Sequence, residues 1–206
     1  MIRDNGETLL NLNENKNIKG KVFVFSAPSG AGKTTLLNYL KSAVPGLVYS
    51  ISATTRKPRD GELNGIHYFF LSEQEFKERI DKNEFAEWAI VHGNYYGTPK
   101  SFIDETIARG FHIIMDIDVF GKKNFDKSYP NAIGILILPP NMEILEKRLR
   151  GRGSDDEETV RTRIKNAKTE IDFARTQGKY EFTVVNDDLE RAKSETEQII
   201  RLHIDI

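Results

Sequence analysis

The sequence predicts an α/β protein in which a parallel β-sheet is flanked by helices. Three observations support this fold class. Short apolar runs at residues 22–25 and 132–138 have the length and composition of strands that are buried on both faces. Segments with helical periodicity separate these runs. Strands that alternate with helices along a chain form parallel sheets, because each helix returns the chain to the start of the next strand.

The composition limits the size of the fold and the kinds of partner. At 206 residues the chain suits one domain, or a core with one or two insertions. A formal net charge of −1 gives no general attraction to nucleic acid or to an anionic membrane. The absence of cysteine excludes disulfides and thiolate metal sites. No apolar run reaches the length of a membrane span, and residues 1–19 look like a polar tail rather than a signal peptide, so we expect a cytoplasmic protein.

The stretch from residue 22 to 37, VFVFSAPSGAGKTTLL, joins a predicted strand, a glycine-rich turn and the start of a helix. This context predicts a phosphate-binding loop, because backbone N–H groups and the positive end of the helix dipole then point at phosphate oxygens. We expect Lys33 to reach the β- and γ-phosphates of a nucleotide, and the Thr34 hydroxyl to bind Mg²⁺. The strict pattern has glycine where this chain has Ala27, and a methyl group is tolerable there if φ stays negative.

A strand-rich segment at residues 52–98 interrupts the alternation of strands and helices. Its one helical signal is a capping box formed by Ser72 and Glu75. Its end, EFAEWAIVHGNYYGT, resembles two strands joined by a turn. We therefore predict an antiparallel insertion over this segment. Before it we expect a helix ending near residue 43 and a strand over 48–52, and within it a strand over 67–71.

The alternation resumes after the insertion. Pro99 begins a helix that Gly110 ends. Ser154 and Glu157 form a second capping box, which predicts the start of a long charged helix ending near Arg175. The other elements expected here are strands over 111–117, 132–138 and 182–185, a helix from about 141 to 150, and an amphipathic C-terminal helix.

Three further groups of residues have the chemistry of a nucleotide site. Arg56 and Arg59 in a polar turn can clamp a phosphate, although a solvated basic loop is the alternative. Glu87, in the insertion, can accept from N1–H and the 2-amino group of guanine, a donor pair that adenine lacks. Asp116 and Asp118 end a predicted strand, where ligands of open α/β sheets bind. One of them is a candidate to orient the water shell of Mg²⁺, and capping of the next loop is the alternative.

A fourth group consists of Arg148, Arg152 and Arg163, which flank a hinge-like Gly-Arg-Gly link. Arginines on a mobile segment can close over transferring phosphates and exclude water. A helix rich in arginine and glutamate is otherwise a solvated face, so these residues alone do not decide the role.

Taken together, the motifs SAPSGAGKTT, SATTRKPRDGELNGIHY, FAEWAIVHGNYYGT, IIMDIDVFG, LEKRLRGRG and VVNDD resemble guanylate kinase, over about residues 20–206. The resemblance implies Mg²⁺-dependent transfer of the ATP γ-phosphoryl group to GMP, in purine nucleotide metabolism. ATP and GMP are the implied partners, dGMP is a further expected substrate, and assembly stays open between monomer and homodimer. The implied fold is a P-loop NTPase core (20–51, 99–139 and 173–206) with an inserted GMP-binding domain (52–98), a helical lid (140–172) and an N-terminal tail (1–19).

The resemblance also implies a role for individual residues. The matched ATP-binding positions are Ser29, Gly30, Ala31, Gly32, Lys33, Thr34 and Thr35. The positions matched to the GMP phosphate are Arg56, Arg59, Tyr68 and Tyr96, and those matched to guanine are Ser52, Glu87, Thr98 and Asp118. Asp116 matches the acidic residue near the metal waters, and the catalytic set is Lys33 with Arg152, Arg163 and Arg148. The family often has serine at position 98, and Thr98 keeps the hydroxyl that would bond guanine O6.

Three other interpretations remain. A switch-type GTPase fits the phosphate loop, but the chain has no Asn-Lys-x-Asp motif. A phosphopeptide-binding module related to guanylate kinases fits the insertion, but such modules have degraded phosphate loops, whereas Lys33 and Thr34 are intact. A kinase for another phosphorylated acceptor fits the phosphate clamp, and the combination of Glu87, Ser52 and Thr98 argues against it.

Overall fold

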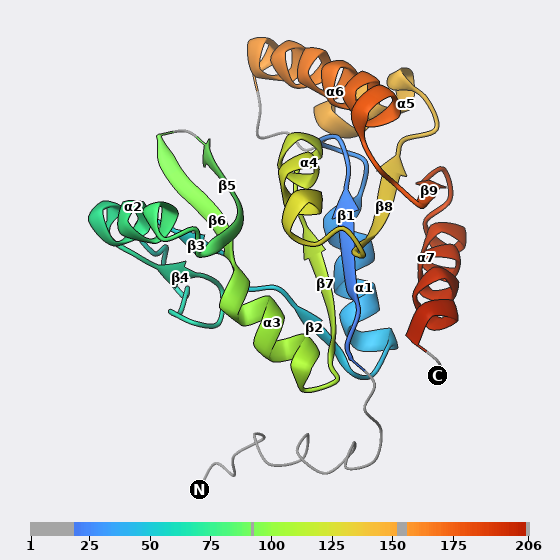
Figure 1. Ribbon diagram of the computed structural model, residues 1–206. Helices are drawn as coiled ribbons and strands as arrows, with labels where there is room; N and C mark the ends of the chain where they lie inside the picture. The colour runs from blue at the N-terminus through green and yellow to red at the C-terminus, as the bar shows by residue number, and fades with distance from the viewer. Residues whose placement is uncertain (1–18, 92, 152–155, 205–206) are drawn as a thin grey trace, which may run out of the picture.

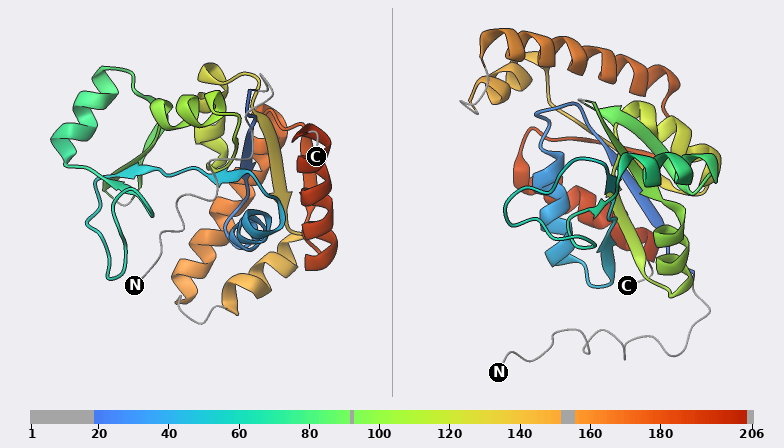
Figure 2. Two further views of the ribbon diagram at one scale, coloured as in Figure 1. Left: turned by 90° about the horizontal axis from the view of Figure 1, so that it is seen from below. Right: turned by 90° about the vertical axis from the view of Figure 1, so that its left-hand side faces the viewer.

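The computed structural model describes residues 19–91, 93–151 and 156–204. It confirms the predicted α/β class, with a five-stranded parallel sheet between helices and a four-stranded sheet beside it (Figures 1 and 2). The larger sheet has the strand order β2-β7-β1-β8-β9. Its strands are β1 (Val22–Ser26), β2 (Leu47–Tyr49), β7 (His112–Asp116), β8 (Ile133–Leu138) and β9 (Phe182–Val185).

The central strand, β1, supplies side chains to both faces of this sheet. Phe23 and Phe25 pack against α1 and α7, whereas Val22 and Val24 pack against α3 and α4, because successive strand residues point to opposite faces. Burial of one such side chain contributes about 1.5–3 kcal/mol. This explains why the apolar run is continuous rather than alternating. The four helices are α1 (Lys33–Ala43), α3 (Lys100–Ala108), α4 (Val119–Ser128) and α7 (Leu189–Ile204).

Two helices, α5 (Met142–Arg150) and α6 (Glu157–Gln177), lie above the carboxyl ends of the strands (Figure 1). They pack on each other through Leu145, Leu149 and Val160, and the far end of α6 packs on the core through Ala174. The predicted capping box at the start of α6 is wrong. The helix begins two residues after the predicted cap position would place it, with Asp156 accepting a 2.7 Å hydrogen bond from the Thr159 N–H.

The physical reason is that Asp caps a helix as well as Ser does. Asp156 is also followed directly by two glutamates, whose charges favour the positive end of the helix dipole. Ser154, which the sequence suggested as the cap, lies outside the described residues.

The smaller sheet is the predicted insertion, with strand order β4-β3-β6-β5. The pairs β3–β6 and β5–β6 are antiparallel, and β3–β4 is parallel. The predicted capping box opens its helix α2 (Glu73–Asp81), because Ser72 accepts from the Glu75 N–H and Glu75 accepts from the Ser72 N–H. The strands are β3 (Ala53–Thr54), β4 (Phe69–Phe70), β5 (Phe85–Val91) and β6 (Asn94–Pro99).

The strand predicted over residues 48–52 ends early, because β2 leaves the larger sheet and β3 begins only at Ala53, in the smaller sheet. β2 ends at Tyr49, and the Ser50 N–H still bonds the Ile114 carbonyl at the edge of the larger sheet. The Ser52 carbonyl already accepts from Phe69 in the smaller sheet. The chain therefore changes sheets within three residues, which fixes where the insertion leaves the core.

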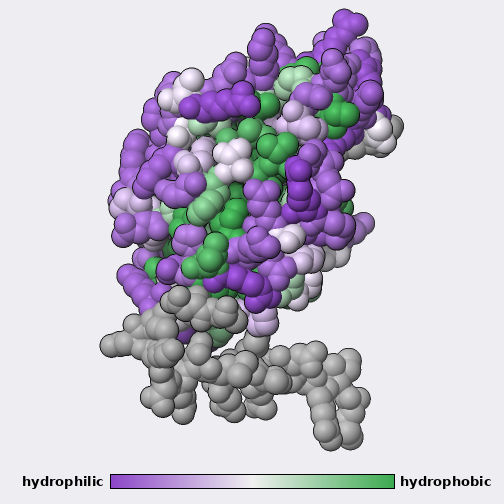
Figure 3. Space-filling view, turned by 90° about the vertical axis from the view of Figure 1, so that its right-hand side faces the viewer, coloured by the Kyte–Doolittle hydropathy of each residue, from purple (hydrophilic) through white to green (hydrophobic). Residues whose placement is uncertain are grey.

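The outer surface on the side of α7 is mostly hydrophilic, with an apolar strip in its centre (Figure 3). The exposed large apolar residues of the last two elements and the turn between them are Val185, Leu189 and Leu202. Among the helices that the structure describes, none combines the length and apolarity that crossing a membrane would require.

Candidate active site

The loop between β1 and α1 has the backbone that a phosphate loop requires. Gly30 and Gly32 have φ angles of 90° and 95°, which residues with a Cβ rarely adopt. A Cβ on Gly32 would lie 2.3 Å from Asn186 Nδ2. That nitrogen donates a buried 2.7 Å hydrogen bond to the Ala31 carbonyl. Asn186 therefore holds the loop from behind, and only glycine leaves it room.

Ala27 stands where the strict phosphate-loop pattern has glycine, and it is tolerable there if its φ is negative. In the described part of the chain, Asn83 is the only non-glycine residue with positive φ. Ala27 therefore has negative φ, and its side chain packs against the core beside β1. The methyl group does not disturb the loop.

A pocket of about 340 Å³ lies in front of this loop. Lys33 is at its side, with Nζ 3.4 Å from Oδ2 of Asp116, and the Tyr49 hydroxyl donates to the other oxygen of that carboxylate. Ala31 is fully buried and is the one predicted ATP-binding residue that does not line the pocket. The lining residues are Ala27, Pro28, Ser29, Gly30, Gly32, Lys33, Thr34, Thr35 and Glu170.

On the insertion, the structure brings together three of the four residues predicted to hold a phosphate. The Arg56 guanidinium lies over the Tyr68 ring, 5.5 Å from its centroid. The Tyr68 and Tyr96 rings meet edge to face at 6.1 Å. After the larger effect of Glu62, Tyr96 also favours the charged form of Arg56. The fourth residue, Arg59, is exposed in the same turn.

Glu62, which the sequence analysis did not single out, orients this cluster. Its two carboxylate oxygens each accept a 2.9 Å hydrogen bond from the Arg56 guanidinium, and one accepts a 2.7 Å bond from the Arg59 N–H. Arg56 first, and then the Arg59 N–H, lowers the pKa of Glu62 to about 2. Sequence reasoning missed Glu62 because Asp60 lies in the same polar turn, and only the fold shows which of the two faces Arg56.

If the insertion binds GMP, as the resemblance to guanylate kinase implies, Glu62→Gln should raise KM for GMP about tenfold, with kcat changed little. The amide keeps one acceptor but loses the charge-assisted bidentate pair, so Arg56 is no longer held in one orientation. Steady-state kinetics with varied GMP measure this effect. Glu78→Gln, the same change at an exposed position of α2, is the control. An unchanged KM would show that Arg56 is oriented without Glu62.

A second cluster surrounds Glu87 at the junction of the insertion and the core. The Thr98 hydroxyl donates a 2.7 Å hydrogen bond to Glu87 Oε1, and Thr98 itself is only 2% exposed. Burial raises the pKa of Glu87 to about 7, with smaller contributions from Asp118 and Asp116, while the Thr98 bond opposes the shift. Ser52 lies just before β3, and its carbonyl takes part in the sheet contact described above.

Asp118 is the N-cap of α4, a helix that the sequence analysis did not predict. Its Oδ1 accepts from the N–H groups of Phe120 and Gly121 at 2.9 and 2.7 Å. A Cβ on Gly121 would lie 3.2 Å from Glu87 Oε2 and 2.7 Å from Cγ2 of Ile117. The glycine thus lets β5 approach the start of α4. This approach brings the carboxylates of Glu87 and Asp118 close together.

The structure describes two of the three predicted catalytic arginines, Arg148 and Arg163. Arg148 Nη2 donates a 2.8 Å hydrogen bond to the carbonyl of Asn186, so it connects α5 to the residue behind the phosphate loop. Arg163 is partly buried on α6. Arg152 lies outside the described residues.

Asn186 and Glu170 are the other site residues that sequence reasoning missed. Asn186 stands in the VVNDD motif, to which no role was attached. Glu170 gave no signal, because it is one of many charged residues on α6.

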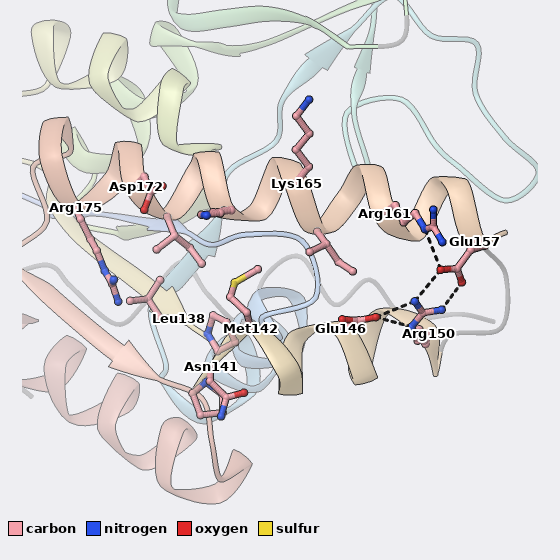
Figure 4. Close-up of a pocket in the computed structure, with 15 residues that line it drawn as sticks. Leu138, Asn141, Met142, Glu146, Arg150, Glu157, Arg161, Lys165, Asp172 and Arg175 are labelled. Atoms are coloured by element: carbon pink, nitrogen blue, oxygen red, sulfur yellow. Dashed lines mark hydrogen bonds and ion pairs between the residues drawn. The ribbon is translucent and has the colours of Figure 1, made fainter.

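A larger pocket of about 940 Å³ lies between α5 and α6 (Figure 4). No residue predicted for nucleotide binding lines it. Arg150 bridges Glu146 and Glu157 across it, and Arg161 also pairs with Glu157 at 3.2 Å. Of these ion pairs, the one between Arg150 and Glu157 joins the two helices, and the other two lie within α5 and within α6.

Comparison with known proteins agrees with this geometry. The family model described as guanylate kinase matches residues 19–203. A guanylate kinase of Carboxydothermus hydrogenoformans is 46% identical over 88% of this chain and 88% of its own, and one of Helicobacter pylori is 45% identical over 84% of this chain and 82% of its own. The crystal structure of a guanylate kinase from Anaplasma phagocytophilum superposes with a TM-score of 0.66 at 30% identity, covering 90% of this chain and 86% of that one. This chain therefore belongs to the guanylate kinase family.

Proposed function

We propose that this chain transfers the γ-phosphoryl group of ATP to GMP, giving ADP and GDP. The observation that carries the proposal is the pairing of two unlike sites. The phosphate loop with Lys33 belongs to the core, and the insertion beside it holds both an arginine–tyrosine cluster and the partly buried carboxylate of Glu87. A phosphate loop alone fits many nucleotide enzymes, whereas this pairing fits a nucleotide donor and a purine monophosphate acceptor.

ATP is assigned to the phosphate-loop pocket. Backbone N–H groups of the loop and the N-terminus of α1 would bind the phosphates, and Lys33 would neutralise the β- and γ-phosphates. The ion pair with Asp116 holds Lys33 at the pocket wall before substrate arrives.

The residues of this pocket also fit Mg²⁺. Thr34 lines the pocket and Asp116 adjoins Lys33, and hydroxyl and carboxylate oxygens are the donors that Mg²⁺ prefers. Within the described residues no cluster of three or more acidic or histidine side chains offers a complete cage. We therefore propose that Thr34 binds the ion directly, that Asp116 acts through water, and that nucleotide phosphates complete the set. When bound, the ion offsets the repulsion between the two phosphate chains.

GMP is assigned to the insertion. Arg56, Arg59, Tyr68 and Tyr96 would hold its phosphate, and Glu87 would accept from N1–H and the 2-amino group. Thr98, Ser52 and Asp118 would bond the remaining edge of the base. None of these assignments involves the ribose 2′-hydroxyl, so we expect dGMP to be a substrate as well.

The chemistry needs positioning more than proton transfer. The acceptor is a phosphate oxygen that is already anionic at neutral pH, so the chain needs no general base. Lys33 and the arginines Arg148, Arg152 and Arg163 would neutralise charge on the transferred group. We propose that residues 140–172 act as a lid over the core formed by 20–51, 99–139 and 173–206, and that closure after GMP binds at 52–98 keeps water from accepting the phosphoryl group. The cytoplasmic location and the choice between monomer and homodimer stay predictions.

The direct test is ADP production from ATP and Mg²⁺, with GMP, AMP, UMP, CMP and dTMP offered separately. Rapid turnover with GMP alone would support both the transfer and the guanine site. Turnover with another acceptor would reassign the insertion. Tight GMP binding without turnover would favour a binding module.

The raised pKa of Glu87 predicts that GMP binding depends on pH. Only the carboxylate can accept from both guanine donors, so binding is weak below its pKa of about 7 and strengthens as the pH rises through that value. We expect the Kd for GMP to be about tenfold higher near pH 6 than near pH 8.

Calorimetry without ATP measures this Kd. The GMP phosphate itself titrates with a pKa of about 6, so Glu87→Gln serves as the control that keeps only this contribution. If wild type and variant have the same pH profile, Glu87 does not read the base as a carboxylate.

A further inference from the structure

The phosphate-loop pocket contains one acidic side chain that the proposed mechanism does not use. Glu170 lines the pocket and is the only lining residue among those described that does not come from residues 27–35. It belongs to α6, which crosses above the loop between β1 and α1 (Figure 1). A residue of the overhanging helix thus reaches into the place assigned to ATP phosphates.

The contacts of Glu170 are those of an anion in a phosphate cradle. Glu170 lines the same pocket as Ser29 and Lys33, and the Lys33 ammonium and, more weakly, the Ser29 N–H favour its charged form. These are the donor and the cation that the loop offers to a phosphate. Burial and the nearby Asp118 act in the opposite direction, with burial the larger effect, and the pKa of Glu170 is raised.

We propose that Glu170 occupies the phosphate loop in place of nucleotide phosphate, and that ATP must displace it to bind. Two anions cannot share one cradle, because each would lose the other's donors and add repulsion. In the empty protein the carboxylate thereby ties α6 to the loop. When ATP displaces the carboxylate, this contact is lost, so ATP binding in the loop directly changes how α6 is held.

The position of Glu170 on α6 explains how replacing its carboxylate with ATP phosphate can affect the whole proposed lid. The first half of α6 packs on α5, whereas Ala174 beyond Glu170 packs on the core. Glu170 therefore lies where the helix passes from the proposed lid to the core. Making or breaking the contact of Glu170 with the loop therefore affects the first half of α6. The end of α6, which packs on the core through Ala174, stays in place.

The test is ATP affinity without GMP, measured by calorimetry for wild type and Glu170→Gln. The amide has nearly the same shape and can still accept from Ser29, but it carries no charge to compete with phosphate. We expect ATP to bind about tenfold more tightly to the variant, the size of effect that one removed charge has near a protein surface. Glu170→Ala is the second variant, and it should also bind ATP more tightly.

Glu158→Gln is the matched control. It removes the same charge from an exposed position of the same helix, about 18 Å from Glu170 along the axis. It should leave ATP affinity unchanged, which separates local competition from a change in net charge.

The inference rests on the proposed function, and the experiment distinguishes the two. If wild type binds ATP and Glu170→Gln binds it equally or more weakly, the displacement is wrong and the kinase assignment stands. A weaker variant would make Glu170 a residue that supports bound nucleotide. If wild type binds no ATP, both proposals fail. Equal tightening in Glu158→Gln would also overturn the local exchange.

Discussion

Replacing Arg163 with alanine is expected to lower the turnover number about 10³-fold, while the affinity for GMP changes little. The guanidinium is assigned to the charge that gathers on the phosphoryl group during transfer. GMP itself is assigned to Arg56 and its neighbours on the insertion, which belong to a different part of the chain from α6. An interaction made only in the transition state is lost from kcat and hardly affects ground-state binding.

The measurement is kcat and KM for GMP at saturating ATP. Arg161→Ala is the matched control, because Arg161 lies two residues away on the same helix, pairs with Glu157 and is largely exposed. Arg163→Lys should restore only part of the rate, since an ammonium lacks the planar fork. Unchanged turnover in Arg163→Ala would remove the residue from the catalytic set. The sequence predicts the same effect for Arg152→Ala.

The second large effect concerns the base. We expect wild type to prefer GMP over IMP by about 10⁴ in kcat/KM, because IMP lacks the 2-amino group and removes one of the two donors that guanine offers to the partly buried Glu87 carboxylate. Glu87→Gln should shrink this preference about 100-fold, mainly through slower use of GMP.

Initial rates with both acceptors give the two ratios. Glu78→Gln, the same substitution on exposed α2, should keep the wild-type preference. If wild type used IMP as efficiently as GMP, the carboxylate would not recognise the 2-amino group, and the pH dependence of GMP binding would need another origin.

Local signals in the sequence predicted the parts of the fold whose causes are local. The β1–α1 loop follows from its glycines, and the start of α2 follows from the reciprocal bonds of Ser72 and Glu75. The break between β2 and β3 does not, because both lie in one polar–apolar run and only their distant partners, β7 and β6, separate them. The missed α4 has the same cause, since its cap, Asp118, looked like the end of a strand.

The site divides in the same way. Lys33, Arg56 and Glu87 could be predicted because their residue types and motifs name a chemistry. Glu62 and Glu170 could not, because what distinguishes them from other surface glutamates is the cation or N–H group that folding places opposite each one. These cations and N–H groups come from residues that only the tertiary structure brings next to each glutamate.

The way in which the insertion joins the core determines how readily it can be exchanged as a unit. It leaves after β2, an edge strand, and returns through α3 to β7, the neighbour of β2, so both connections lie on one side of β1 and its phosphate loop. We expect that a designed chimera can therefore replace the insertion without altering the strand order around β1 and its phosphate loop. Gly121 and Glu87 would have to be kept together at this junction, because a Cβ on Gly121 would lie 3.2 Å from Glu87 Oε2 and 2.7 Å from Ile117 Cγ2.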